Sequence, residues 1–203
     1  MFVITADQKR SARRGDRVPE ALEDLAAVSH GAGLPFERTV GDEVQALLDS
    51  PGAVVEAVAR LTRLGGWRLG IGVGPVEEPL PATTRAASGP AFLAAREAVT
   101  QARSSPVDLR VVRAGVGGRD YGLDEPAHRA ESALWLLVAV LRRRTPEGWE
   151  IAGMAGEGMT GRAMAERLGI SPSAVSQRLA RAGVTEARRG AELAAALLGE
   201  ADR

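Results

Sequence analysis

The chain has 203 residues, with 26 basic and 26 acidic side chains, two histidines and no cysteine. This length can bury one substantial core or two small ones. The zero net charge gives no overall attraction to polyanions, and the lack of cysteine excludes disulfides and thiolate metal sites. The N-terminal stretch MFVITADQKR is too short and polar for a signal peptide, and the longest apolar run, 133–141, is too short to span a bilayer. We therefore expect a cytoplasmic protein that contacts no membrane.

The first half of the chain alternates strand-like and helix-like patterns. Alternating glycines in WRLGIGV indicate a strand that another backbone approaches closely. The order β-α-β-β-α-β-α-β is typical of an α+β domain with a split βαβ, ferredoxin-like sheet. The expected elements are a strand at 2–6, a helix at 19–28, a hairpin of 36–40 and 44–48, a helix at 51–64, a strand at 67–73, a helix at 90–102 and a strand at 108–114.

After Gly115 the composition changes. The stretch GVGGRDYGLDEP is glycine-rich and polar, as linkers are. All that follows has helical patterns, and three arginines favour the C-terminal dipole end of the first of these helices. We predict helices at 127–144, from Pro146 onward, as a pair joined at Gly169, and at 185–198. The predicted organisation is an α+β domain at 1–118, a linker at 119–127 and an all-α domain at 128–203.

Residues 159–183, MTGRAMAERLGISPSAVSQRLARAG, have the pattern of a helix-turn-helix. Gly169 suits the turn because it adopts a positive φ without strain. Ser171 can cap the second helix, and Pro172 fits its first turn. Four apolar residues are spaced to pack the two helices together: Leu168, Ile170, Val175 and Leu179.

The outer face of that second helix predicts contact with double-stranded DNA. Its first half carries small polar side chains where base edges are met, and Gln is suited to adenine; these residues are Ser171, Ser173, Ser176 and Gln177. Residues 160–189 hold six arginines and two glutamates, and four of the arginines are placed for phosphates: Arg178, Arg181, Arg188 and Arg189. We expect a homodimer, since one helix-turn-helix buries little surface. The alternative is a helical hairpin that only packs on the first domain.

Carboxylates gather at one end of the predicted sheet. Asp7 follows the first strand, and Asp42 lies at the hairpin tip with Glu43 beside it. In a split βαβ sheet these segments can be neighbours, and carboxylate oxygens are the ligands that Mg²⁺ prefers. Such a pair could anchor nucleotide phosphates and support two-metal phosphoryl chemistry. An aspartate in a hairpin turn is also ordinary turn chemistry, so a structural role is the alternative.

Four motifs, in this order and spacing, resemble the SatD family of bacterial proteins: ITADQKRS, TVGDEVQALL, RLGIGVG and SGPAFLAAR. The N-terminal part of that family is related to the palm of class III nucleotidyl cyclases and diguanylate cyclases. VGDEV stands where diguanylate cyclases carry their GGDEF-type hairpin. SatD-like proteins also end in a helix-turn-helix region, so the resemblance covers most of the chain.

This resemblance implies roles for five residues. Asp7 and Asp42 match the two metal-binding aspartates of the palm, and Glu43 matches the second acidic residue of the hairpin motif. Gly41 matches the glycine that lets a nucleotide approach. Arg96 falls where class III cyclases place a transition-state arginine.

The chain departs from the cyclase pattern at two positions. The asparagine expected one helical turn before that arginine is replaced by Phe92, and Lys9, the only lysine, leaves none to read a purine base. We therefore interpret the first domain as a nucleotide-sensing or dimerising derivative of the palm and the whole chain as a DNA-binding transcriptional regulator. The alternatives are a Mg²⁺-dependent nucleotide-processing enzyme and a scaffold whose acidic pair is vestigial.

Overall fold

The computed structural model describes residues 1–115 and 125–203. Its strands are β1 (Phe2–Gln8), β2 (Leu34–Arg38), β3 (Glu43–Leu48), β4 (Trp67–Val73) and β5 (Leu109–Arg113). They form one mixed sheet in the order β2-β3-β1-β4-β5. The central strand β1 is antiparallel to both β3 and β4, β2 and β3 form an antiparallel hairpin, and β4 and β5 are parallel. The protein is therefore an α+β structure built on a five-stranded sheet.

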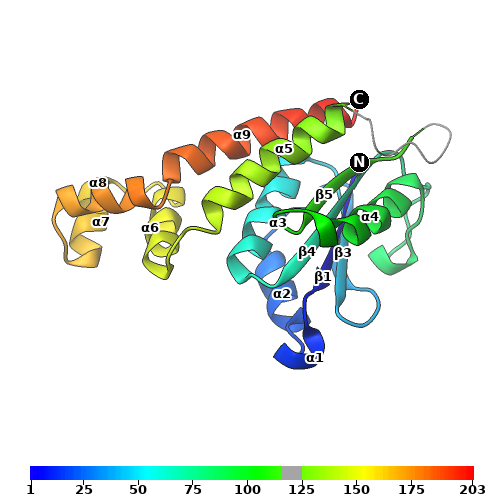
Figure 1. Cartoon of the computed structure of the whole chain (residues 1–203), viewed down its shortest axis with the longest axis horizontal. Coiled ribbons are helices and arrows are strands. Elements are labelled where there is room, and N and C mark those ends of the chain that lie inside the picture. The colour runs from blue at the N-terminus through cyan, green and yellow to red at the C-terminus, as the bar shows by residue number, and fades with distance from the viewer. Residues whose placement is uncertain (116–124) are drawn as a thin grey trace.

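Helices cover both faces of this sheet (Figure 1). On one face, α2 (Val18–Leu25) and α3 (Pro51–Leu64) cover the side chain of Phe2, and on the other α4 (Pro90–Gln101) covers Val3. Because successive side chains of a strand point to opposite faces, both sides of β1 need an apolar cover. Short helical turns complete this part of the chain: α1 (Ser11–Arg14), η1 (Thr84–Ala86) and η2 (Ala102–Ser104).

Two glycines of β4 let α4 lie directly on the strand. A Cβ atom at Gly70 would come within 2.3 Å of the Val99 backbone nitrogen, and one at Gly72 within 2.1 Å of the Ala91 carbonyl oxygen. Any larger side chain would force the helix away from the sheet. The close approach predicted from the alternating glycines is confirmed.

Two long helices, α5 (Glu125–Leu141) and α9 (Val184–Ala201), lie side by side and pack beside α3 (Figure 1). Leu134 and Leu198 are fully buried in the same core as Phe2. Apolar contacts therefore join the two halves of the chain across the predicted linker at 119–127, most of which lies outside the described residues. A division into two domains at that point stays a prediction.

Three further helices, α6 (Pro146–Gly156), α7 (Gly161–Leu168) and α8 (Pro172–Arg181), form a smaller unit between α5 and α9 in the chain. This α6–α8 unit has a core of its own, in which Ile151 and Val175 are buried. In Figure 1 it forms one end of an elongated molecule, with the sheet at the other.

The helix predicted at 127–144 ends earlier than its arginine run indicates. α5 stops at Leu141, so the extension to Arg144 is wrong. The Arg142 guanidinium donates to the Val107 carbonyl at 2.8 Å, and Thr145 is the extended N-cap of α6. A helix cannot run into an extended cap residue, so it must end before it.

Each strand and helix predicted before residue 115 is present; α3 and β4 have the predicted bounds, and the ends of the others differ by a few residues. Within the described part of the chain, no helix combines the length and apolar character that a bilayer span requires.

Replacing Gly70 by alanine should destabilise the protein by about 2–3 kcal/mol, because the new methyl group has no room between β4 and α4. Gly52→Ala is the matched control, since that exposed glycine of α3 has open space around it and alanine favours a helix. Urea unfolding measures both. Equal unfolding midpoints for the two variants would contradict the close packing of α4.

Asp108, which precedes β5, forms ion pairs with two cations. We expect its contribution to the free energy of unfolding to depend on pH. Burial alone would raise the pKa of Asp108, but Lys9 at 2.8 Å and Arg142 at 3.1 Å outweigh it and hold that pKa below its ordinary 3.8. A carboxylate with a lowered pKa stabilises the fold at pH values above its unfolded pKa, and the effect is lost as pH falls through the folded pKa.

Asp108→Asn should therefore cost about 1–2 kcal/mol at pH 7. Asparagine tolerates the positive φ of 53° at this position, so the backbone is not the cause. Urea unfolding at several pH values should show a constant difference from the parent above about pH 5 and a shrinking one below about pH 4. A difference that does not change with pH would contradict this role of the two ion pairs.

Candidate functional site

Local signals define the two helices of the predicted helix-turn-helix, α7 and α8. Thr160 caps α7, where its side chain accepts a hydrogen bond from the Ala163 amide at 3.2 Å, and Gly169 ends that helix with φ 63°. Ser171 caps α8 by accepting from the Ala174 amide at 3.1 Å. The cap at Ser171 and the positive φ at Gly169 are confirmed.

The inner faces of these helices bury a small apolar core. Val175 of α8 is buried against Met164 and Ala165 of α7 and Ile151 of α6. The other residues predicted to join the two helices pack around them, half-buried: Leu168, Ile170 and Leu179. The inner face is thus occupied, which leaves the opposite face of α8 toward solvent.

That outer face of α8 is polar. Ser173, Ser176 and Gln177 are exposed, and among the described residues no hydrogen bond engages the amide of Gln177. The Ser176 hydroxyl donates to the carbonyl of Pro172 at 3.2 Å, and the Ser171 hydroxyl serves its own helix as a cap. Gln177 and Ser173 are therefore the side chains most available to a partner.

The four predicted phosphate contacts differ in their surroundings. Arg178 is half-buried, 3.8 Å from the Glu150 carboxylate, and Arg188 is paired with Glu192 at 2.7 Å. Arg181 and Arg189 are exposed, and no carboxylate of the described chain lies within 4.0 Å of either. No carboxylate of the described chain thus neutralises the charge of Arg181 or Arg189.

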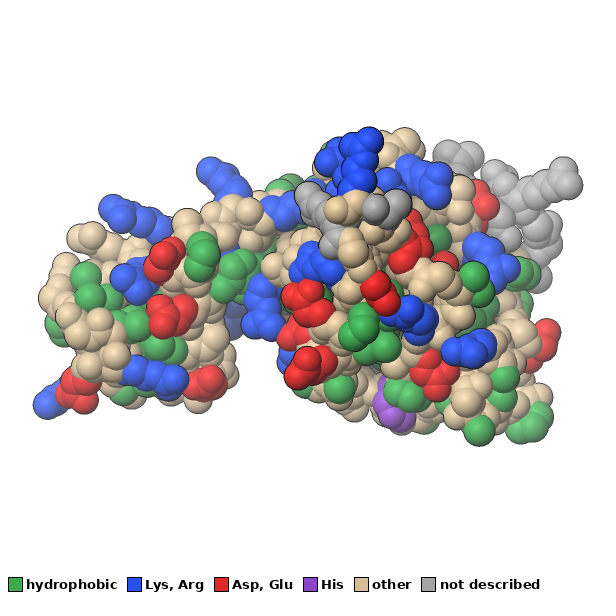
Figure 2. Space-filling view, turned by 90° about the horizontal axis from the view of Figure 1, so that it is seen from below, with side chains coloured by type: hydrophobic (Ala, Val, Ile, Leu, Met, Phe, Trp, Pro, Cys, Tyr) green, Lys and Arg blue, Asp and Glu red, His purple; other side chains and the backbone are tan. Residues whose placement is uncertain are grey.

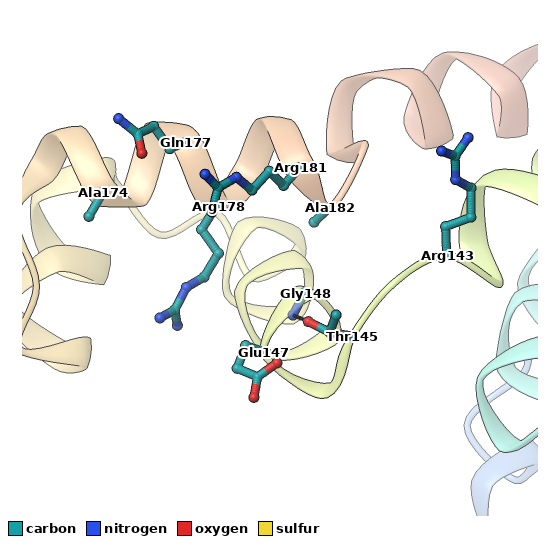
Figure 3. A pocket seen from close by; sticks show the side chains of 9 residues that line it. All are labelled: Arg143, Thr145, Glu147, Gly148, Ala174, Gln177, Arg178, Arg181 and Ala182. Carbon is teal, nitrogen blue, oxygen red and sulfur yellow. Dashed lines mark hydrogen bonds between the residues drawn. The ribbon is translucent and has the colours of Figure 1, made fainter.

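A cavity of about 390 Å³ separates α8 from the start of α6 (Figure 3). Figure 3 shows Arg178 extending from α8 toward Glu147, while Arg143, two residues beyond the end of α5, lines the cavity with its side chain directed toward α9. The Thr145 hydroxyl lowers the pKa of Glu147. Sequence reasoning did not assign Arg143 to this site; its place in the run Arg142–Arg144 was the available signal.

The residues predicted to bind a metal lie at one end of the sheet. Asp7 of β1 lies opposite Glu43 of β3, and the Gln8 amide donates to the Asp42 carbonyl at 3.2 Å, so the strand end and the hairpin are neighbours as predicted. Arg68 of β4 lies opposite Asp7 on the other side and donates to its carboxylate at 3.1 Å. The positive charge of Arg68 offsets the repulsion between the neighbouring carboxylates of Asp7 and Glu43.

Among the described residues, no group of three or more acidic or histidine side chains is placed to hold a metal ion. The Mg²⁺ site at Asp7, Asp42 and Glu43 stays a prediction. Gly41 has φ 62° and open space around it, which a tight hairpin turn is enough to explain.

A second cavity, of about 260 Å³, brings two of the predicted palm residues together. Glu43 and Arg96 both line it, and Phe92 of α4 provides an apolar wall between the hairpin and the helix. The Thr39 hydroxyl donates to the Glu43 carboxylate at 2.5 Å. The described residues that line this cavity do not include Asp7 or Asp42.

Comparison of the chain with protein-family models, with curated proteins and with solved structures found no match. The resemblance to the SatD family therefore stays an expectation based on the four motifs.

Proposed function

We propose that this protein is a DNA-binding transcriptional regulator that contacts double-stranded DNA through α8. The observation that carries the proposal is the polar outer face of α8, where Ser173, Gln177 and Arg181 face solvent while Val175 holds the helix in place. A helix with a packed inner face and free polar side chains near its N-terminus can enter the major groove and meet base edges.

Arginines flank this face at places suited to a DNA backbone. Arg181 is the last residue of α8, Arg143 lines the same cavity from the segment between α5 and α6, and Arg188 and Arg189 follow in the first half of α9. Guanidinium groups bind phosphates through parallel hydrogen bonds, which set the position of the protein on the duplex. In this proposal Gln177 reads a base and the arginines hold the backbone.

The sheet would serve as a sensing or dimerising part of a ferredoxin-like, palm-type fold. The strand order β2-β3-β1-β4, with every neighbouring pair antiparallel, is compatible with a split βαβ sheet extended by β5. A homodimer would present two α8 helices to two half-sites, which multiplies specificity.

Two substitutions on α8 should change DNA binding in different ways. Arg181→Ala should weaken binding to all sequences by about tenfold and lower the slope of log affinity against log salt by about one, because one phosphate contact is lost. Gln177→Ala should instead relax sequence preference, with a loss of about 1–3 kcal/mol at the base it contacts. The measurement is fluorescence anisotropy with a labelled duplex whose central base pairs are randomised, followed by selection of the bound sequences.

Arg103→Ala is the control, since this exposed arginine lies in η2, on the sheet body. It should bind the duplex as the parent does. The proposal fails if the chain does not bind the duplex at low salt, or if all three variants lose affinity equally.

A second candidate function is Mg²⁺-dependent nucleotide processing. The observation in its favour is that Glu43 and Arg96 line one cavity beside the Asp42 turn. An acidic residue and an arginine are the groups that phosphoryl transfer uses to hold a metal and to stabilise the transition state. The ion pair of Asp7 with Arg68 argues against this second function, because Arg68 occupies the carboxylate of one of the two expected metal ligands.

This second function predicts turnover of a nucleoside triphosphate by the purified chain with Mg²⁺ or Mn²⁺, lowered about 100-fold or more by Arg96→Ala. Product formation from a panel of the common triphosphates is the measurement, with Arg103→Ala as control. Turnover that survives Asp42→Ala would exclude this site as its source.

A further inference from the structure

A third cavity, of about 320 Å³, lies where one end of the sheet meets α6. Residues from five parts of the fold line it: Lys9 after β1, Arg63 at the end of α3, Gly66 before β4, Arg142 and Arg144 after α5, and Trp149 of α6. We call it the junction cavity. Small-molecule sites of this size favour the boundary between two structural units. Figure 2 shows a hollow between the smaller lobe and the sheet body with basic side chains along it.

Cations outnumber carboxylates around the junction cavity. Asp108 is shared by Lys9 at 2.8 Å and Arg142 at 3.1 Å. Arg63 pairs with Asp24 at 2.5 Å, and Arg60, which also approaches Asp24, pairs with Glu56 at 2.8 Å. Among the described residues that line the cavity, Asp108 is the one carboxylate beside four cations, so the cavity keeps a positive field that favours an anion.

Arg144 is the cation with the least compensation. Its Nε donates to the Ala182 carbonyl at 2.8 Å, and its guanidinium lies 4.8 Å from the centre of the Trp149 ring. In the described part of the chain no carboxylate lies within 4.0 Å of it. Burial lowers the pKa of Arg144. A half-buried charge without an ionic partner is costly, and a bound anion would offset that cost.

Arg144 also lines a neighbouring cavity of about 430 Å³, together with Arg63, Trp149 and the ion pair of Arg60 with Glu56. The two cavities thus share three lining side chains, and an extended ligand could reach from one to the other. Several cations around one space fit an anion with more than one negative group, and guanidinium groups match phosphate geometry best. The indole of Trp149 adds an aromatic surface.

We propose that the junction cavity binds a small molecule bearing two or more phosphate groups, held by Lys9, Arg63 and Arg144. This site is distinct from the cavity of Glu43 and Arg96, which lies on the α4 side of the sheet. Arg144 also bonds to Ala182, the residue that follows α8. A ligand that displaces the Arg144 guanidinium would therefore change the affinity of α8 for DNA, a coupling that rests on the proposed DNA-binding function.

Tryptophan fluorescence of the full chain tests the site without any DNA. Titration with inorganic pyrophosphate, and separately with ATP, both without Mg²⁺ and at low salt, should change the emission of Trp149 with saturation. Trp149→Phe should remove most of that signal. Lys9→Ala and Arg63→Ala should each weaken binding by about tenfold or more, because a charge-assisted contact to phosphate is lost.

Two control variants distinguish the junction cavity from the remaining basic surfaces of the protein. Arg103→Ala removes an exposed arginine elsewhere and should bind as the parent does, and Arg96→Ala tests the cavity beside the hairpin. Absence of saturable binding would overturn the proposal, as would binding that Arg96→Ala abolishes and that Lys9→Ala and Arg63→Ala leave intact.

The two proposals fail separately. Pyrophosphate binding that depends on Lys9 and Arg63, in a chain that does not bind the duplex, would support the cavity and overturn the DNA-binding function. Duplex binding without pyrophosphate binding would do the reverse. With both present, saturating pyrophosphate should shift duplex affinity by about threefold or more, and an unchanged affinity would overturn the coupling through Arg144.

Discussion

The hydrogen bond from Arg144 to the Ala182 carbonyl closes the α6–α8 unit at its base, and the proposed functions depend on that closure. The chain enters this unit at Arg144 and leaves it at Ala182. On either side, α5 and α9 are buried in the core that covers the sheet. Because both ends of the unit are held, the outer face of α8 has a defined direction relative to the sheet. A DNA-contacting helix joined to the sheet by one flexible segment would have no fixed direction relative to it.

The neutral composition of the chain conceals how its charges are distributed. Some acidic side chains of the sheet body are engaged in ion pairs, as Asp7 is with Arg68 and Asp108 is with Lys9 and Arg142. Cations remain in excess at the junction cavity and along α8 and the start of α9. Electrostatic attraction to phosphates is set by such local fields and not by the total charge. The two proposed phosphate-binding surfaces are therefore compatible with a net charge of zero.

The candidate sites were predictable to different extents. The residues of α8 were found from the sequence because a cap residue, a turn glycine and a polar helix face occur within a few residues of one another. The partner of Asp7 was not, because Arg68 meets it through the register of β1 and β4, sixty-one residues apart. The cavity of Glu43 and Arg96 was not predicted either, because it forms between the β2–β3 hairpin and α4, which are distant in the sequence.

By itself, the sequence determined which elements form and some of their ends, such as those marked by the caps at Thr160 and Ser171 and the turn at Gly169. These signals act through hydrogen bonds and backbone preferences within one turn of chain. Only the tertiary structure decided that α5 ends at Leu141, that α5 and α9 share the core of the sheet, and that Arg144 meets both Trp149 and Ala182. Those outcomes depend on contacts between distant segments, whose geometry follows from how the whole apolar surface is buried and not from local pattern.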